Sequence, residues 1–177
     1  MRLVRLGYAC NNACSFCAQG SLAERQTPRP SVDELLAGIA AGDRVCFVGG
    51  EPTLQPDLPD LIRAAIARGA AATVVQTNAR RLAYPAYARS LRDAGLWGID
   101  ASLAGATAPM HEIHTRIEGS FSQTLTGIAN AARLGISVGI TVVVTRSNYR
   151  HLPDIVRLAH RLRAQQLHLQ GVRAVGR

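Results

Sequence analysis

Residues 3–17 read LVRLGYACNNACSFC, and this stretch decides the fold because an apolar run leads directly into three closely spaced cysteines. Other short apolar runs follow at 45–48, 72–76, 98–103, 136–144 and 167–171. They are rich in Val and Ile and show little alternation, which is typical of strands buried on both faces of a sheet. We therefore predict six strands, the first over residues 3–9.

Amphipathic stretches with a helical period separate these runs, at 31–41, 58–68, 84–94, 120–135 and 148–164. Ser31 with Glu34, and Ser120 with Gln123, have the spacing of capping boxes that open helices. Six strands alternating with five helices imply an α/β fold with parallel strands joined by right-handed crossovers. Both an open doubly wound sheet and a curved partial barrel satisfy this pattern.

Polar and glycine-rich residues follow the predicted strands, where either architecture would place a functional site. The three-cysteine loop follows the first strand, and Gly49-Gly50-Glu51-Pro52-Thr53 follows the second. Thr77-Asn78 ends the third strand and Ser102 ends the fourth. The sequence therefore predicts one site at the carboxyl edge of the sheet.

Cys10, Cys14 and Cys17 form a C-x3-C-x2-C motif. This spacing lets thiolates from one loop converge on a metal centre, and thiolates suit zinc and iron–sulfur clusters. Structural zinc takes four ligands, but Cys46 lies inside the second predicted strand and is poorly placed to be the fourth. A 4Fe–4S cluster held by three cysteines keeps one iron open for a ligand. Zinc and an electron-transfer cluster remain alternatives at this point.

The motif, with Phe16 directly before the last cysteine, resembles the signature of the radical S-adenosylmethionine (radical SAM) superfamily. The resemblance covers nearly the whole chain and implies a partial (β/α)6 barrel. It also implies that Cys10, Cys14 and Cys17 each bind one iron of a 4Fe–4S cluster, while the fourth iron chelates S-adenosylmethionine. Reductive cleavage of this cofactor would give a 5′-deoxyadenosyl radical. That radical would abstract hydrogen from a peptide, protein or small-metabolite substrate.

The segment Gly49-Gly50-Glu51-Pro52 is similar to the GGEP motif of this family, and the resemblance implies that these four residues, like Phe16, contact the cofactor. Two glycines allow a close backbone approach to a ligand, and the carboxylate of Glu51 can accept hydrogen bonds from the ammonium group of the cofactor. Asn78 and Ser102 match polar positions that end the third and fourth strands in the family, so the resemblance implies that they contact the cofactor. The fifth and sixth strands would flank its adenine.

Other positions depart from the family pattern. Ala104 stands where an Asp is common, and residues 111–121 resemble a segment of the form H-D-x-[IL]-R-G in which His114 matches the His. Arg116 lies nearby and could pair with the cofactor carboxylate. We expect His111 and His114 to be exposed loop residues or caps. The segment 172–177 resembles a family x-P-x-G stretch.

Composition limits the remaining choices. A chain of 177 residues fits one domain, so we predict a single radical SAM core over 1–177, either a minimal enzyme or the core of a longer one. The net charge of +8 comes from scattered arginines with only 5% aromatic residues, which does not favour nucleic acid. The sequence lacks a long apolar run and a signal peptide, so we expect no membrane contact and a cytoplasmic location.

The resemblance further implies a partner that supplies electrons, of the flavodoxin or ferredoxin type. Two other functions compete with a radical SAM enzyme. One is a non-catalytic zinc or iron–sulfur binding module. The other is an open-sheet nucleotide-binding enzyme, although no G-x-G-x-x-G follows the first strand.

Overall fold

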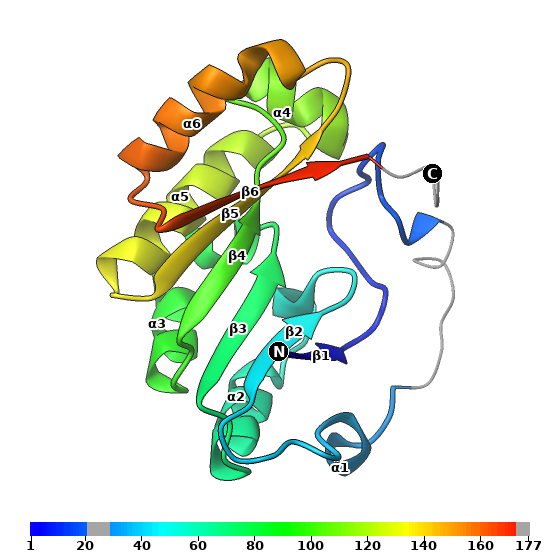
Figure 1. The fold of residues 1–177 in the computed structure, drawn as a ribbon, viewed down its shortest axis with the longest axis vertical. Coiled ribbons are helices and arrows are strands. Elements are labelled where there is room, and N and C mark those ends of the chain that lie inside the picture. The colour runs from blue at the N-terminus through cyan, green and yellow to red at the C-terminus, as the bar shows by residue number, and fades with distance from the viewer. Residues whose placement is uncertain (21–28, 173–177) are drawn as a thin grey trace.

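The computed structural model describes residues 1–20 and 29–172, which form one sheet and its covering helices (Figure 1). All neighbouring strands are parallel, and their order in the sheet equals their order in the chain. The strands are β1 (Arg2–Arg5), β2 (Arg44–Val48), β3 (Ala72–Thr77), β4 (Gly98–Ser102), β5 (Ser137–Val144) and β6 (Gln166–Gly171). Because β1 and β6 do not pair within the described residues, the sheet is an open, partial (β/α)6 barrel, as predicted.

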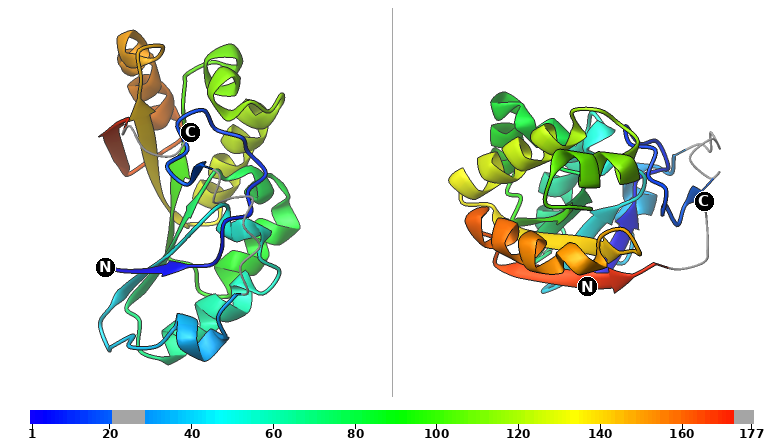
Figure 2. Two further views of the ribbon diagram at one scale, coloured as in Figure 1. Left: turned by 90° about the vertical axis from the view of Figure 1, so that its right-hand side faces the viewer. Right: turned by 90° about the horizontal axis from the view of Figure 1, so that it is seen from above.

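Helices α2, α3, α5 and α6 lie along one side of the sheet, and the cysteine loop crosses near the strand ends (Figures 1 and 2). The α-helices are α1 (Val32–Leu35), α2 (Leu58–Ala67), α3 (Pro85–Asp93), α4 (Ala108–Thr115), α5 (Ser120–Arg133) and α6 (Leu152–Arg161). Three 3₁₀ helices complete the described elements: η2 (Pro52–Leu54), η3 (Arg80–Ala83) and η4 (Tyr149–His151).

The hydrophobic core lies between the sheet and these helices. Alternate strand residues such as Phe47, Val75 and Ile140 are fully buried against helix residues such as Leu61 and Ile128. Burial of each such side chain contributes about 1.5–3 kcal/mol. This layer of packing therefore holds the strands in register and fixes where their carboxyl ends meet.

The outer strands differ from the prediction of burial on both faces. In β6 only Leu167 is even half-buried, and in β1 only Val4 is buried. The prediction was wrong here because β1 and β6 are the two edge strands of the sheet, and each has a neighbouring strand on one side only. The first strand is also shorter than predicted, since it ends at Arg5 and the chain then turns toward the end of β2.

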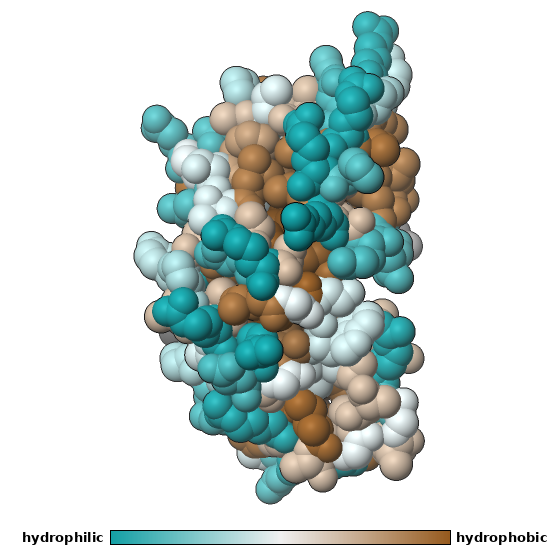
Figure 3. All heavy atoms as spheres, turned by 90° about the vertical axis from the view of Figure 1, so that its left-hand side faces the viewer, coloured by the Kyte–Doolittle hydropathy of each residue, from teal (hydrophilic) through white to brown (hydrophobic). Residues whose placement is uncertain are grey.

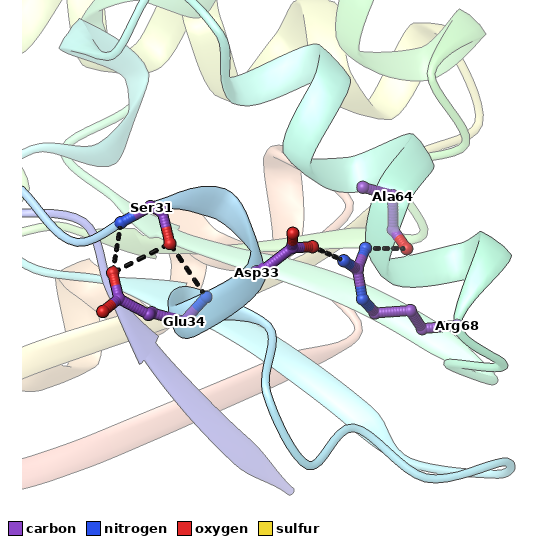
Figure 4. Close-up of polar contacts among 5 residues, drawn as sticks. All are labelled: Ser31, Asp33, Glu34, Ala64 and Arg68. Atoms are coloured by element: carbon purple, nitrogen blue, oxygen red, sulfur yellow. Dashed lines mark hydrogen bonds and ion pairs between the residues drawn. The ribbon is translucent and has the colours of Figure 1, made fainter.

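Helix α1 begins as predicted but ends early (Figure 4). Ser31 and Glu34 form the predicted capping box, with the Ser31 backbone N–H donating to Glu34 Oε2 at 2.8 Å. Arg68, just past α2, pairs with Asp33 and joins the two helices. The helix stops at Leu35 instead of residue 41 because Gly38 adopts a left-handed conformation, with φ +69°.

The second predicted capping box is absent. Helix α5 begins at Ser120 after Gly119, which has φ +75° and no side chain to cap the helix, and the Phe121 N–H in the first turn donates to Glu112 Oε1 of α4 at 3.2 Å. The hydroxyl of Ser120 is instead buried against Thr115 Oγ1 at 2.7 Å. Thr115 ends α4, a helix that the sequence pattern did not predict.

The outer surface carries hydrophilic side chains over most of the side that lies at the left of Figure 1, with narrow apolar strips between them (Figure 3). No helix in the described ranges has both the length and the apolar character needed to span a bilayer.

Candidate functional site

A cavity of about 250 Å³ opens at the carboxyl ends of the strands. Its walls come from the cysteine loop, the turns after β2 and β3, the ends of β4 and β5, and helix α4. Its lining residues include Cys10, Cys14, Phe16, Cys17, Gln19, Gly49, Gly50, Glu51, Asn78, Ser102, His111, Thr115, Thr141 and Val143. Most of the predicted site residues thus line a single cavity.

The double glycine after β2 lets two backbone segments touch. A Cβ on Gly50 would lie 2.1 Å from the carbonyl oxygen of Ala9, and one on Gly49 would lie 2.5 Å from that of Gly7. The Gly50 N–H donates to the Gly7 carbonyl at 2.9 Å, and the Glu51 N–H donates to the Ala9 carbonyl at 2.8 Å. In the described structure, therefore, the glycines make room for the chain that enters the cysteine loop.

Glu51 is 2% exposed and connects the turn after β2 to the end of β3. Its Oε1 accepts hydrogen bonds from Thr53 Oγ1 and Thr77 Oγ1, both at 2.6 Å, and from the Thr53 N–H at 3.0 Å. Its Oε2 accepts one, from the Asn78 N–H at 2.7 Å. Burial raises the pKa of Glu51, and the donors oppose this shift. Oε2 has a lone pair left for a donor in the cavity.

The cysteine loop is held from the β3 side by two side chains. Asn78 Nδ2 donates to Asn11 Oδ1 at 2.6 Å. Arg80 donates through Nη1 to Asn12 Oδ1 at 2.8 Å and to the carbonyl of Asn11. Asn78, predicted to contact the cofactor, therefore both lines the cavity and fixes the loop.

Helix α4 holds the other side of the same loop. The carbonyls of His114 and Thr115, at the helix end, accept hydrogen bonds from the N–H groups of Ser15 and Ala13, each at 2.9 Å. His114 Nδ1 lies 3.2 Å from Ser15 Oγ, and its ring lies 5.4 Å from that of Phe16. His114 is 8% exposed because the loop folds over it, and His111 is 1% exposed, so the prediction that both are exposed loop histidines was wrong.

The three thiols face a common space. Burial raises the pKa of Cys14 to about 11, and the neighbouring Cys10 and Cys17 raise it further because thiolates repel one another. Burial likewise raises the pKa of Cys10. A bound cation would offset this repulsion and displace the thiol protons, so the donor set fits an iron–sulfur cluster. In residues 1–20 and 29–172, no three His, Cys, Asp or Glu side chains group closely enough to hold a single metal ion. The ligand role of the thiols stays a prediction.

Three further predicted residues lie differently. Ser102 is exposed and lines the cavity at the end of β4. Pro52 begins η2 and is buried outside the cavity lining. Arg116 follows α4 with φ +57° and an exposed side chain, also outside the lining. The proposed contacts of Pro52 and Arg116 with the cofactor stay predictions.

The two strands expected to flank adenine, β5 and β6, contribute unequally to the cavity lining. Thr141 and Val143 of β5 line the cavity, whereas no residue of β6 does so among the described lining residues. The terminal segment that resembles x-P-x-G begins at Val172 and otherwise lies outside the described residues.

Sequence reasoning missed several lining or supporting residues, among them Gln19, Arg80, His111 and Thr141. Thr141 had a signal, because it is a polar residue within an apolar run. His111 had none, since it is 1% exposed only because α4 packs it against the end of β4.

Comparison with known proteins gives consistent matches. The family model described as the radical SAM superfamily matches residues 4–159. An AdoMet-dependent heme synthase from Nitratidesulfovibrio vulgaris is 29% identical over 91% of this chain and 45% of its own length. The mycofactocin maturase MftC from Mycobacterium ulcerans is 34% identical over 97% of this chain and 47% of its own length.

The fold also matches solved structures. Streptococcus suis SuiB bound to the precursor peptide SuiA aligns with a TM-score of 0.77 at 16% identity, covering 97% of this chain and 39% of SuiB. The chain spans about half the length of the curated relatives it matches.

Proposed function

This chain belongs to the radical SAM superfamily, whose enzymes use a 4Fe–4S cluster and S-adenosylmethionine, and we propose that both bind in the cavity at the strand ends. Cys10, Cys14 and Cys17 would each hold one iron. The observation that carries the proposal is that all three thiols line the same cavity as Gly49, Gly50 and Glu51.

Held there by Cys10, Cys14 and Cys17, a reduced cluster would supply the electron for reductive cleavage of S-adenosylmethionine, and the hydrogen abstraction from the substrate would follow from that chemistry. The residues of this chain position the reactants and exclude water. Glu51 Oε2 would accept a hydrogen bond from the cofactor ammonium, because that oxygen has only one described donor. Asn78, Ser102 and Phe16 also line the cavity, and their side chains would contact the bound cofactor.

We further propose a peptide substrate and an electron donor of the flavodoxin or ferredoxin type. The peptide proposal is supported by the similar fold of SuiB, which binds the precursor peptide SuiA. Peptides encoded beside the gene would be incubated with the reduced enzyme and S-adenosylmethionine. A mass loss in one peptide, matched by 5′-deoxyadenosine, would support this class of substrate, and turnover of a small metabolite alone would refute it.

The catalytic proposal is tested by anaerobic reconstitution followed by addition of dithionite and S-adenosylmethionine. We expect about four irons per chain and release of 5′-deoxyadenosine. Cys14→Ala should lose both, whereas Cys46→Ala should keep both, since Cys46 is buried inside β2. Full iron and activity in Cys14→Ala would show that the ligand assignment is wrong.

A further inference from the structure

His111 presents a hydrogen-bond donor that the structure leaves without an acceptor. Its Nδ1 lies 3.2 Å from the backbone nitrogen of Ala104 and accepts the N–H of that residue. A neutral imidazole carries one proton, so the accepting role of Nδ1 places the proton on Nε2. Burial lowers the pKa of His111 to about 4, which keeps the ring neutral near pH 7.

The Nε2 atom is buried and has no hydrogen-bond partner among the described residues. Leaving a buried donor unpaired destabilises the folded protein, so buried polar groups nearly always have partners. One other buried side-chain atom in the described residues is unpaired, Gln19 Oε1. Both residues line the cavity that holds the three cysteines. The two unpaired atoms, one donor and one acceptor, therefore point to a polar ligand in this cavity.

The charges around the cavity show what kind of ligand group His111 would meet. The described lining residues include the carboxylate of Glu51 but no arginine, and the chain has no lysine. The cofactor carries a carboxylate and ribose hydroxyls as well as its ammonium. The described lining contains no cationic side chain, so the side-chain donors that it offers to those oxygens are neutral. His111 supplies a buried one on the wall formed by α4 and the end of β4.

We propose that His111 binds S-adenosylmethionine by donating its Nε2–H to an oxygen of the cofactor, while Nδ1 stays bonded to Ala104. This inference rests on the proposed function of the cavity. The oxygen belongs either to the carboxylate of the methionine part or to the ribose. Binding of methionine and of 5′-methylthioadenosine distinguishes the two.

Two variants separate the two ring nitrogens. His111→Asn places an amide oxygen near the position of Nδ1, so it keeps the bond to Ala104 but lacks the donor at Nε2. His111→Gln is longer and places an amide N–H near Nε2, so it keeps the donor and loses the bond to Ala104. A purely structural role predicts that His111→Gln is the more damaging change, whereas cofactor binding predicts that His111→Asn is.

The measurement is equilibrium binding to the oxidised, cluster-loaded protein without reductant, so no turnover is needed. We expect His111→Asn to weaken S-adenosylmethionine binding about tenfold, the effect of losing one hydrogen bond, and His111→Gln to restore most of it. Both variants should unfold within a few degrees of the parent protein. Methionine and 5′-methylthioadenosine then locate the oxygen, because only the first has the carboxylate and only the second has the ribose.

Three results bear on the proposal. Parent-like affinity in His111→Asn would overturn it while leaving the proposed function intact. Failure of the loaded parent protein to bind S-adenosylmethionine would overturn both. Weaker binding of methionine but not of 5′-methylthioadenosine by His111→Asn would support the proposal and assign the carboxylate, and the reverse pattern would assign the ribose.

Discussion

Replacement of Gly50 by alanine tests how the cysteine loop is supported. The new Cβ would lie 2.1 Å from the Ala9 carbonyl oxygen and 2.3 Å from that of Tyr8, and both obstacles are backbone atoms. The loop backbone must therefore retreat by about 1 Å to reach an ordinary contact distance. Such a shift breaks the hydrogen bonds that Gly50 and Glu51 donate to the carbonyls of Gly7 and Ala9.

The cost can be estimated from these contacts. Two lost hydrogen bonds and the overpacking together should lower the free energy of unfolding by about 3–5 kcal/mol. That is a large part of the 5–15 kcal/mol typical of a domain. Because the displaced segment leads into Cys10, we also expect cluster loading to fall by more than half.

The assay is urea unfolding together with iron content after anaerobic reconstitution. Gly171→Ala is the matched control, since a Cβ there meets no atom within 4 Å and should change neither quantity. A Gly50→Ala protein with the stability and iron content of the parent would refute the reasoning about the double glycine.

Three other predictions concern the support of the cysteine loop, the accessibility of Cys46 and the titration of His111. Arg80→Ala removes the hydrogen bonds to Asn12 and to the Asn11 carbonyl, so a chelator should remove the cluster several-fold faster than from the parent protein. Arg89→Ala is the control and should lose the cluster at the parent rate. Equal rates for Arg80→Ala and the parent would contradict the role of Arg80 in holding the cysteine loop. Cys46, whose pKa burial raises to about 11, should resist iodoacetamide at pH 8 in the folded protein, and rapid alkylation would show that it is accessible. Because burial lowers the folded pKa of His111 to about 4, below the unfolded value near 6.5, the unfolded state gains the proton first as pH falls. Stability should therefore drop by up to about 3 kcal/mol between pH 6.5 and 4, and His111→Phe should flatten that drop in urea unfolding.

The sequence was sufficient to predict the sheet and the edge of the sheet at which the site lies. Apolar runs of strand length, with cysteines, glycines or polar residues directly after them, predicted both the strand count and the location of the cavity. These features are local, because strand burial and strand-end chemistry each follow from a few consecutive residues. The choice of a partial barrel came from the family resemblance, since the alternation alone also fitted an open sheet.

The sequence was not sufficient to predict helix α4 or the burial of its two histidines. A helix this short is marginal by itself and is stabilised by burial of His111, His114 and Thr115. Ser15 lies against His114 and the Ala104 N–H donates to His111, and both of these contacting residues lie outside α4 in the sequence. The end of α1 was missed for a related reason, since its early stop depends on the backbone conformation of Gly38.

The most direct measurement is an anomalous diffraction map, recorded at the iron edge, from crystals of the reconstituted protein grown without oxygen and with S-adenosylmethionine. The account predicts a four-iron peak bounded by the sulfurs of Cys10, Cys14 and Cys17, with the methionine part of the ligand on the fourth iron and its ammonium near Glu51. Iron bound elsewhere, or a single ion between these sulfurs, would contradict it.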